Sequence, residues 1–151
     1  MAARMQNPAV LVPEAMQAIH ALNKAARKGG VPDVTLELVH MRASQINGCG
    51  PCLDMGGDHL RKAGVSDQRI WTLAGWRETP YYSDAERAAL ALAECVTRLG
   101  DRPDAVPDEV WDEAAEHYDE QGLSSLLLVI GVTNLFNRLN VSVRQQAGAW
   151  G

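Results

Sequence analysis

The segment from Leu123 to about Leu139 constrains the fold more than any other part of the sequence. Its composition favours a helix, and apolar side chains occupy nearly every face of that helix. A helix without a polar face has to be covered by other elements on every side, which a chain of 151 residues rarely achieves alone. The segment therefore predicts either a central core helix or a helix that also packs against another subunit.

The rest of the chain also favours helices. Gly and Pro residues separate segments with helical periodicity, and strand patterns are nearly absent. We expect an all-α fold of about seven helices in a single domain that spans residues 1–151. The expected helices run from Pro13 to Gly29, from Pro32 to Asn47, from Gly50 to Ala63, from Ser66 to Trp76, from Ser83 to Gly100, from Pro107 to Gly122, and from Leu123 to Leu139.

Charge and hydropathy argue against several classes of partner. The net charge is -5 and the 14 Lys and Arg residues are dispersed, so we expect no nucleic-acid partner. The most apolar run, Leu126 to Ile130, is far shorter than the roughly 20 residues of a membrane span. The N-terminal residues contain no apolar export signal. These features predict a cytoplasmic protein that does not enter a membrane.

Two of the three cysteines form the motif Cys49-Gly50-Pro51-Cys52, which lies where a helix is expected to begin. Free N–H groups and the helix dipole stabilise a thiolate at such a position, and the spacing lets the two sulfurs close a small disulfide ring. The motif indicates a dithiol oxidoreductase. Thioredoxins carry the same tetrapeptide, but they require a preceding strand, and here a helix precedes it.

Two other interpretations of the cysteine pair stay open. The pair could be half of a zinc site, or two inert buried thiols. A zinc site needs two further ligands, but the four histidines lie on separate helices or faces, and Cys95 is expected to be a small buried hydrophobe. We therefore expect neither a metal nor a bound cofactor.

A redox dithiol also needs a group that accepts protons. Glu37 falls close to one line with Ser44 and the helix end before Cys49, so its carboxylate could serve, although the periodicity alone favours a solvated glutamate. His59 lies two helical turns after Cys52, about 10 Å along the axis, and could reach the sulfur only through water. His59 and His40 are otherwise expected to be surface or structurally satisfied histidines.

The residues around the motif resemble the carboxymuconolactone decarboxylase and alkylhydroperoxidase D (AhpD-like) family. The resemblance covers roughly residues 10–148 and begins with Glu37, eleven intervening residues and Cys49-x-x-Cys52. Further family landmarks follow in order: Leu53-Asp54-Met55, Arg61-Lys62-Ala63-Gly64, Trp76-Arg77-Glu78-Thr79-Pro80, Ser83-x-x-Glu86-Arg87-Ala88-Ala89-Leu90 and Asn134-x-x-Asn137-Arg138-Leu139.

The resemblance implies a helical homo-oligomer, a trimer or a hexamer, that reduces organic peroxides or disulfides. It implies that Cys52 attacks the peroxide, that Cys49 resolves the product, and that Glu37 relays protons. A dithiol protein, such as a lipoyl domain or a thioredoxin-like protein, would reduce the oxidised pair.

One position departs from the family pattern. Redox members place a histidine four residues after the second cysteine, where this chain has Gly56. Water, His59 or Glu37 would then have to carry the proton, or turnover would be slow, because general acid–base catalysis contributes about 10² to 10⁴ in rate. We also expect the missing side chain to enlarge the pocket beside Cys52. A lactone-acid decarboxylase and a non-catalytic helical or ligand-binding protein are the alternative functions.

Overall fold

The computed structural model describes residues 2–149, and every regular element in that range is helical. This confirms the all-α prediction. The elements are α1 (Pro8–Leu11), α2 (Pro13–Ala26), α3 (Asp33–Asn47), α4 (Gly50–Lys62), α5 (Asp67–Trp71), the 3₁₀ helix η1 (Leu73–Glu78), α6 (Asp84–Thr97), α7 (Asp108–His117) and α8 (Glu120–Val143).

Most helix boundaries follow from local chemistry. The hydroxyl of Ser83 accepts from the backbone N–H of Glu86, and the Glu86 carboxylate accepts from the backbone N–H of Ser83, so a capping box begins α6. The helix expected at 66–76 is two elements, α5 and η1, that meet at Thr72. The short α1 was not expected, and the side chain of Asn7 caps it by accepting from the backbone N–H of Ala9.

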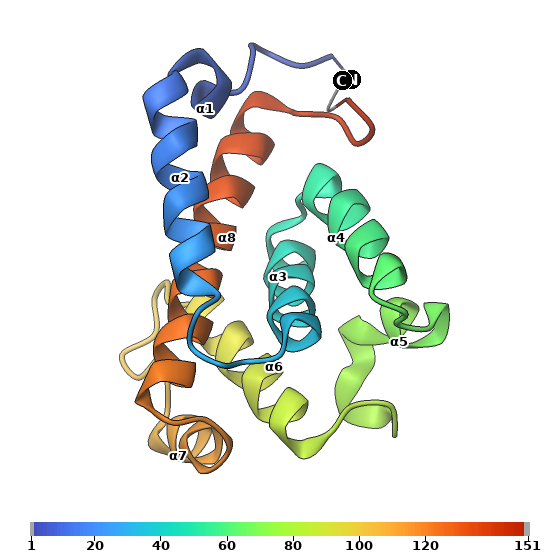
Figure 1. Ribbon diagram of the computed structural model, residues 1–151, viewed down its shortest axis with the longest axis vertical. Helices are drawn as coiled ribbons and strands as arrows, with labels where there is room; N and C mark the ends of the chain where they lie inside the picture. Colours follow the sequence, from blue (N-terminus) through green and yellow to red (C-terminus); the bar gives the residue numbers. More distant parts are fainter. Residues whose placement is uncertain (1, 150–151) are drawn as a thin grey trace.

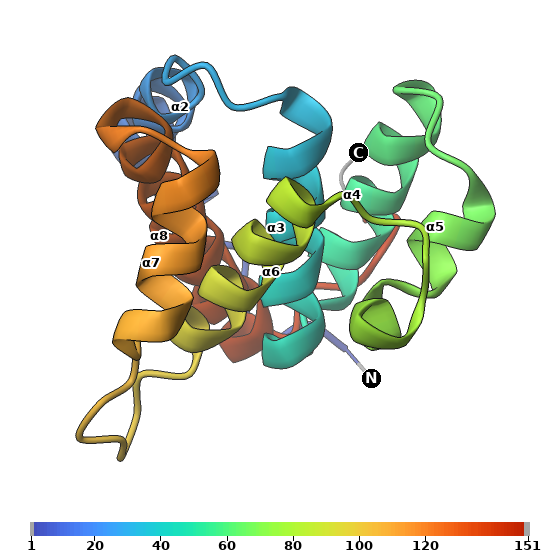
Figure 2. The same cartoon turned by 90° about the horizontal axis from the view of Figure 1, so that it is seen from below.

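Helices α3 and α8 form the centre of the molecule. Helix α8 packs against α2, α3 and α6, and α3 packs against α4, α6 and α8. In Figure 1, α2 and α8 run side by side, α4 lies on the opposite side, and α3 lies between them. Figure 2 shows the same arrangement from below, with α6 beside α3. The beginning of α4 therefore faces the C-terminal half of α8.

Burial of α3 is more complete than its sequence indicates. The spacing of Leu36 and Val39 is typical of a single apolar face, but α3 contributes to two hydrophobic clusters. Leu36 and Val39 pack with α6 and α8, whereas Leu38 and Met41 pack with Leu60 and other residues of α4 and η1. The buried polar side chains of Glu37 and Ser44 on α3 have partners, which permits their burial.

Helix α8 contributes to the core, in keeping with the first of the two arrangements that the sequence left open. It runs for 24 residues, longer than expected, and by length and composition it could span a membrane. Its most apolar window has a mean hydropathy of 1.5. Its contacts with α2, α3 and α6 leave 44% of that window buried. Leu128, Leu135 and Val141 remain exposed along it.

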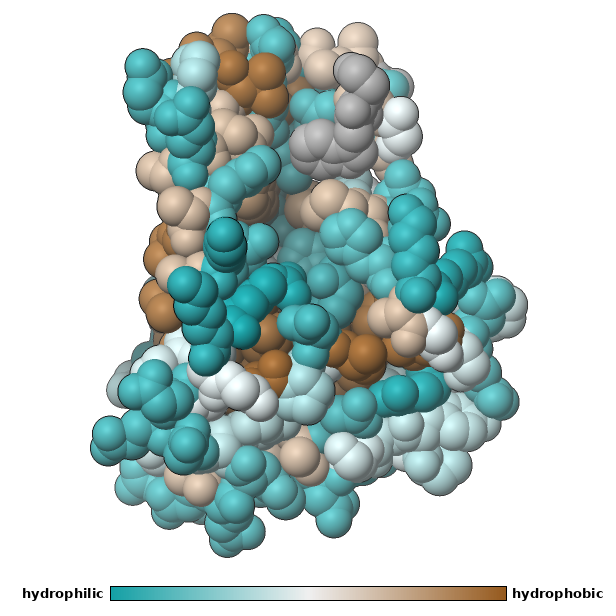
Figure 3. Space-filling view, viewed as in Figure 1, coloured by the Kyte–Doolittle hydropathy of each residue, from teal (hydrophilic) through white to brown (hydrophobic). Residues whose placement is uncertain are grey.

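Some apolar side chains lie on the surface. Figure 3 shows hydrophobic atoms over α1 at the top of the view, and Val10, Leu11 and Val12 in this region are about half exposed. Leu99 lies beyond Thr97, the last residue of α6, and is 54% exposed. Cys95 is a free thiol and only partly buried, so the prediction of a buried hydrophobe at this position is wrong.

Candidate functional site

The site begins at the junction between α3 and α4. Gly48 ends α3 in the left-handed conformation, with φ of 68°, and the backbone N–H of Cys49 donates to the carbonyl oxygen of Ser44. This turn makes Cys49 the N-cap of α4, puts Pro51 in the first turn, and places Cys52 third in the helix. Local sequence thus fixes both sulfurs at a helix N-terminus, as predicted.

Cys49 and Cys52 form a disulfide, and both residues are buried. The pairing differs from both alternatives in the sequence analysis, a zinc half-site and two inert thiols. Across residues 2–149, no group of three His, Cys, Asp or Glu side chains could hold a metal ion. The structure therefore presents a closed dithiol pair.

Two asparagines of α8 donate to the disulfide. The Asn137 Nδ2 atom lies 3.2 Å from Cys52 Sγ, and the Asn140 Nδ2 atom lies 3.3 Å from the same sulfur. The Asn140 amide is also 3.6 Å from Cys49 Sγ. Asn137 is 1% exposed and Asn140 is 2% exposed, so water does not compete for these contacts.

Other amides orient these donors. Asn47 donates to Asn137 Oδ1 at 2.9 Å, and Asn7 donates to Asn140 Oδ1 at 2.6 Å. With each Oδ1 atom used as an acceptor, the Nδ2 atoms face the sulfurs. Asn137 Nδ2 also lies 3.1 Å from Ser44 Oγ. Ser44, which we expected on one line with Glu37, thus contacts the asparagine amides of α8.

Glu37 is a buried carboxylate with three cationic or titratable neighbours, so the interpretation as a solvated glutamate is wrong. Its oxygens lie 3.4 Å from Arg27 Nη2, 3.6 Å from His59 Nδ1 and 3.9 Å from His40 Nε2. Its side chain is 10% exposed, whereas the side chain of His59 is 51% exposed. The structure therefore brings Glu37 and His59 together, at the edge of solvent.

His40 connects this cluster to Cys52. Its Nε2 atom lies 3.3 Å from the Cys52 carbonyl oxygen, and its Nδ1 atom lies 3.2 Å from Thr133 Oγ1. Desolvation lowers the pKa of His40 below its ordinary value of 6.5, although Glu37 partly opposes this shift. The ring is therefore neutral at pH 7, and its one N–H serves either the Cys52 carbonyl or the Thr133 hydroxyl.

Gly56 does not enlarge the pocket, so that expectation is wrong. A Cβ atom at this position would lie 2.6 Å from Met41 Sδ and 3.2 Å from His40 Cδ2. Side chains of α3 already fill the space, and the glycine allows α3 and α4 to pack closely. The imidazole of His40 lies next to the position that a histidine occupies in redox members of the resembled family.

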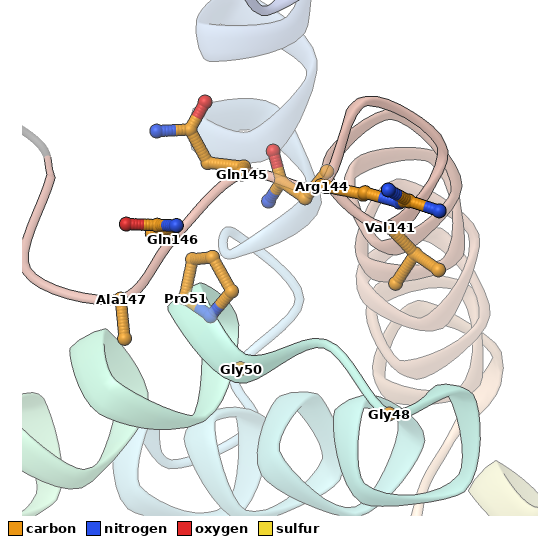
Figure 4. A pocket seen from close by; sticks show the side chains of 9 residues that line it. Gly48, Gly50, Pro51, Val141, Arg144, Gln145, Gln146 and Ala147 are labelled. Atoms are coloured by element: carbon orange, nitrogen blue, oxygen red, sulfur yellow. The ribbon is translucent and has the colours of Figure 1, made fainter. Parts of the chain in front are cut away.

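Two hollows flank the buried disulfide. One, of about 90 Å³, opens between α2, α4 and α8 and is visible as a depression in Figure 3. Its lining includes Arg27, Glu37, His40 and His59. The other, of about 360 Å³, lies at the beginning of α4 under the segment after α8. Figure 4 shows Pro51 facing Gln145 and Gln146 across this second hollow, which Asn140 also lines.

The sequence identified part of this arrangement. Cys49, Cys52, Glu37 and His59 were candidates, and neither Glu37 nor His59 has a recorded contact with a sulfur. The residues that reach the cysteines are His40, Asn137 and Asn140, and none of them was a candidate. The signals were a histidine three residues after a glutamate, and asparagines spaced by three in an otherwise apolar helix.

Comparisons with known proteins point to one family. The sequence model of the carboxymuconolactone decarboxylase family matches residues 13–94. The uncharacterized protein YdfG of Bacillus subtilis is 36% identical over 92% of this chain and 93% of its own length. The alkyl hydroperoxide reductase AhpD of Brucella anthropi is 46% identical over 43 residues, which are 28% of this chain and 25% of that protein.

Solved structures agree with the helical arrangement. A crystal structure from Agrobacterium tumefaciens superimposes with a TM-score of 0.89 and 32% identity. The match covers 98% of this chain and 99% of that one. That protein is of unknown function and is a candidate antioxidant defence protein AhpD. The similarity therefore extends over nearly the whole helical fold.

Proposed function

Because this chain belongs to the carboxymuconolactone decarboxylase family, we propose that it is an AhpD-like dithiol oxidoreductase that reduces organic peroxides. The observation that carries the proposal is the Cys49–Cys52 disulfide at the start of α4. His40, which contacts the Cys52 carbonyl oxygen, also belongs to a buried carboxylate–imidazole cluster with Glu37. A helix N-terminus favours a thiolate, and the cluster offers groups that exchange protons. The similarity to AhpD supports the same chemistry.

The proposed reaction has three steps. The Cys52 thiolate attacks one peroxide oxygen, the O–O bond breaks, and Cys52 becomes a sulfenic acid while an alkoxide leaves and is protonated. The Cys49 thiol then attacks the Cys52 sulfur, which forms the disulfide and releases water. A dithiol partner finally transfers two electrons to the disulfide and is itself oxidised to a disulfide.

His40 supplies the link that Gly56 lacks. The Nε2 atom of its ring lies 3.3 Å from the Cys52 carbonyl oxygen and 3.9 Å from a Glu37 oxygen, and Glu37 contacts His59 at the solvent edge. A proton needed by the leaving alkoxide can therefore come from the cluster through His40 or a water molecule in the adjoining hollow. In this arrangement Glu37 and His59 act as the relay, and His40 connects the relay to the dithiol.

The wider setting follows from the same chemistry. We propose that residues 1–151 act as one domain in a cytoplasmic homo-oligomer, a trimer or a hexamer. A reducing compartment keeps dithiol donors available, and a lipoyl domain or a thioredoxin-like protein fits as the donor. A lactone-acid decarboxylase is the weaker candidate, because that reaction makes no use of a dithiol pair.

Intact mass spectrometry of the reduced protein tests the proposal directly. One equivalent of an organic peroxide should remove two hydrogen atoms per chain, and dithiothreitol should restore them. The Cys52→Ser variant should show no such loss. Cys95→Ser is the matched control, because it removes a thiol outside the pair and should behave as the wild type. Unchanged peroxide reduction in Cys52→Ser would refute the role of Cys52, and slow overoxidation without a disulfide would favour a non-catalytic protein.

A further inference from the structure

We propose that Asn137 and Asn140 are catalytic residues whose side-chain amides hold the negative charge of Cys52 when the disulfide opens, an inference that rests on the proposed function. Both donors already lie within 3.3 Å of Cys52 Sγ. A disulfide sulfur is a weak hydrogen-bond acceptor, whereas a thiolate is a strong one. The contacts therefore become stronger as charge develops on the sulfur.

The amides are held in place before the charge forms. Asn47 and Asn7 occupy the Oδ1 atoms of Asn137 and Asn140, so neither amide has to turn when the disulfide is reduced. No charged side chain has a recorded contact with either sulfur in the described part of the chain. Neutral donors in a water-excluded site thus provide the stabilisation that a cation provides elsewhere.

The two sulfurs do not receive equal support. Cys52 Sγ accepts from two amides, at 3.2 and 3.3 Å, whereas Cys49 Sγ has one amide at 3.6 Å. The better stabilised thiolate is the better leaving group in thiol–disulfide exchange. The asymmetry therefore directs an incoming thiolate to the sulfur of Cys49.

A dithiol donor reduces the pair in two successive exchange steps. A thiolate of the donor attacks Cys49 Sγ, the Cys49–Cys52 bond breaks, and its electron pair stays on Cys52 Sγ beside the two amides. The donor is then joined to Cys49 by a mixed disulfide. Its second thiolate attacks the donor's own sulfur in that bond, which releases Cys49 and oxidises the donor to a disulfide. The two donor protons end on Cys49 and in solvent.

The larger hollow offers a path to Cys49. Gly48 and Gly50, which flank Cys49, both line it, and a Cβ atom at either position would meet nothing within 4 Å. Asn140 lines the same hollow and touches both sulfurs. An opening of this wall therefore exposes Cys49 from the side of its two glycines.

The thiol pKa of Cys52 tests the amide contacts. In a Cys49→Ser background, the rate of alkylation by iodoacetamide is measured against pH. Asn137→Leu and Asn140→Leu should each raise the pKa of Cys52 by about one unit, which leaves about tenfold less thiolate below that pKa. Asn134→Leu is the matched control, because Asn134 belongs to the same helix and the same amide network but has no recorded contact with sulfur.

A second measurement needs no asparagine substitution. In the Cys49→Ser protein, the side-chain NH₂ resonances of Asn137 and Asn140 should titrate with the thiolate absorbance of Cys52. Both results would support the proposal. The proposal would be overturned if the amide resonances did not change with the titration of Cys52, or if folded leucine variants had an unchanged Cys52 pKa. Either result would hold whether or not the protein reduces peroxides.

Trapping experiments test the direction of attack. The oxidised wild-type protein is treated briefly with the monothiol 2-mercaptoethanol, quenched with iodoacetamide, and mapped by peptide mass spectrometry. We expect the mixed disulfide on Cys49 and the alkyl group on Cys52. The reverse assignment would overturn the proposed asymmetry. Because no peroxide is used, a protein that fails to reduce peroxides can still give either result.

Discussion

Two buried carboxylates on the central helices have opposite surroundings. Glu94 on α6 accepts from Arg77 Nη1 at 2.7 Å, from Arg42 Nε at 2.8 Å and from Trp76 Nε1 at 3.0 Å. Glu37 on α3 has no hydrogen bond or ion pair recorded below 3.4 Å. Their side chains are almost equally buried, at 7% and 10% exposure.

The difference separates a carboxylate that is held by short contacts from one whose looser surroundings fit the relay proposed above. Burial raises the pKa of Glu94, but hydrogen bonds from Arg42, Arg77 and Trp76 outweigh burial, and the net pKa is lowered. Glu94 therefore stays ionised and ties η1 to α3 and α6. Glu37 instead lines a hollow with two imidazoles nearby, and its longer contacts leave room for a water molecule to bridge. Burial alone does not distinguish the two carboxylates, whereas the number of short contacts does.

The largest expected effect comes from Glu94→Gln. The substitution leaves the cation of Arg42, whose side chain is 12% exposed, without its counter-charge, so the free energy of unfolding should fall by about 3 kcal/mol. Urea unfolding followed by circular dichroism measures it. The exposed Glu113→Gln is the control and should change stability by less than about 0.5 kcal/mol. A loss below about 1 kcal/mol for Glu94→Gln would mean that the short contacts do not hold the fold.

Glu37→Gln should show the opposite balance. Peroxide turnover should fall by about a hundredfold, because the relay loses its carboxylate. The free energy of unfolding should fall by only about 1 kcal/mol, since Arg27 keeps access to water. Turnover with dithiothreitol as the donor and urea unfolding give the two values. Full turnover with a large loss of stability would make Glu37 a structural residue like Glu94.

A smaller effect concerns the pH dependence of stability through His40. Its pKa in the folded protein is below the ordinary 6.5, so the unfolded chain binds this proton more readily. The contribution of neutral His40 is complete above pH 6.5 and is lost as the pH falls through its folded pKa. His40→Asn should therefore flatten the fall in unfolding free energy below pH 6.5. An unchanged slope would show that the ring is not desolvated in solution.

The smallest expected effect is that of His59→Asn on stability. The side chain of His59 is half exposed, and exposed ion pairs contribute about 0 to 1 kcal/mol. We expect a change below about 0.5 kcal/mol in urea unfolding, while peroxide turnover falls measurably. A stability loss as large as that of Glu94→Gln would place His59 with the structural charges.

Helix positions were largely predictable because their signals are local. The prolines, the glycines and the Ser83–Glu86 capping box act within a few residues, and the helix ends followed them. The burial of α3 was not predictable in the same way. Its polar residues suggested a solvated face, but they are paired with residues distant in sequence, as Arg42 is with Glu94. Periodicity carries no information about such partners.

The candidate site likewise has a part that depends on local sequence and a part that depends on distant contacts. The cysteine pair and its place at a helix start follow from four adjacent residues. The amides of Asn137 and Asn140 reach the sulfurs only because α8 packs against the α3–α4 junction. Gly56 was misjudged because the space beside a glycine depends on its neighbours, here Met41 and His40.

The hydrogen bond between Asn7 and Asn140 couples the start of the chain to its thiol chemistry. Asn7 is 3% exposed, and Arg4, three residues earlier, donates its backbone N–H to the carbonyl oxygen of Val143, at the end of α8. A fusion tag or a proteolytic cut that pulls these residues away would release the Asn140 amide to rotate. The cysteines would remain intact, but under the proposal above their reactivity would change. The N-terminal sequence of an expressed protein is therefore a variable in any measurement of its redox behaviour.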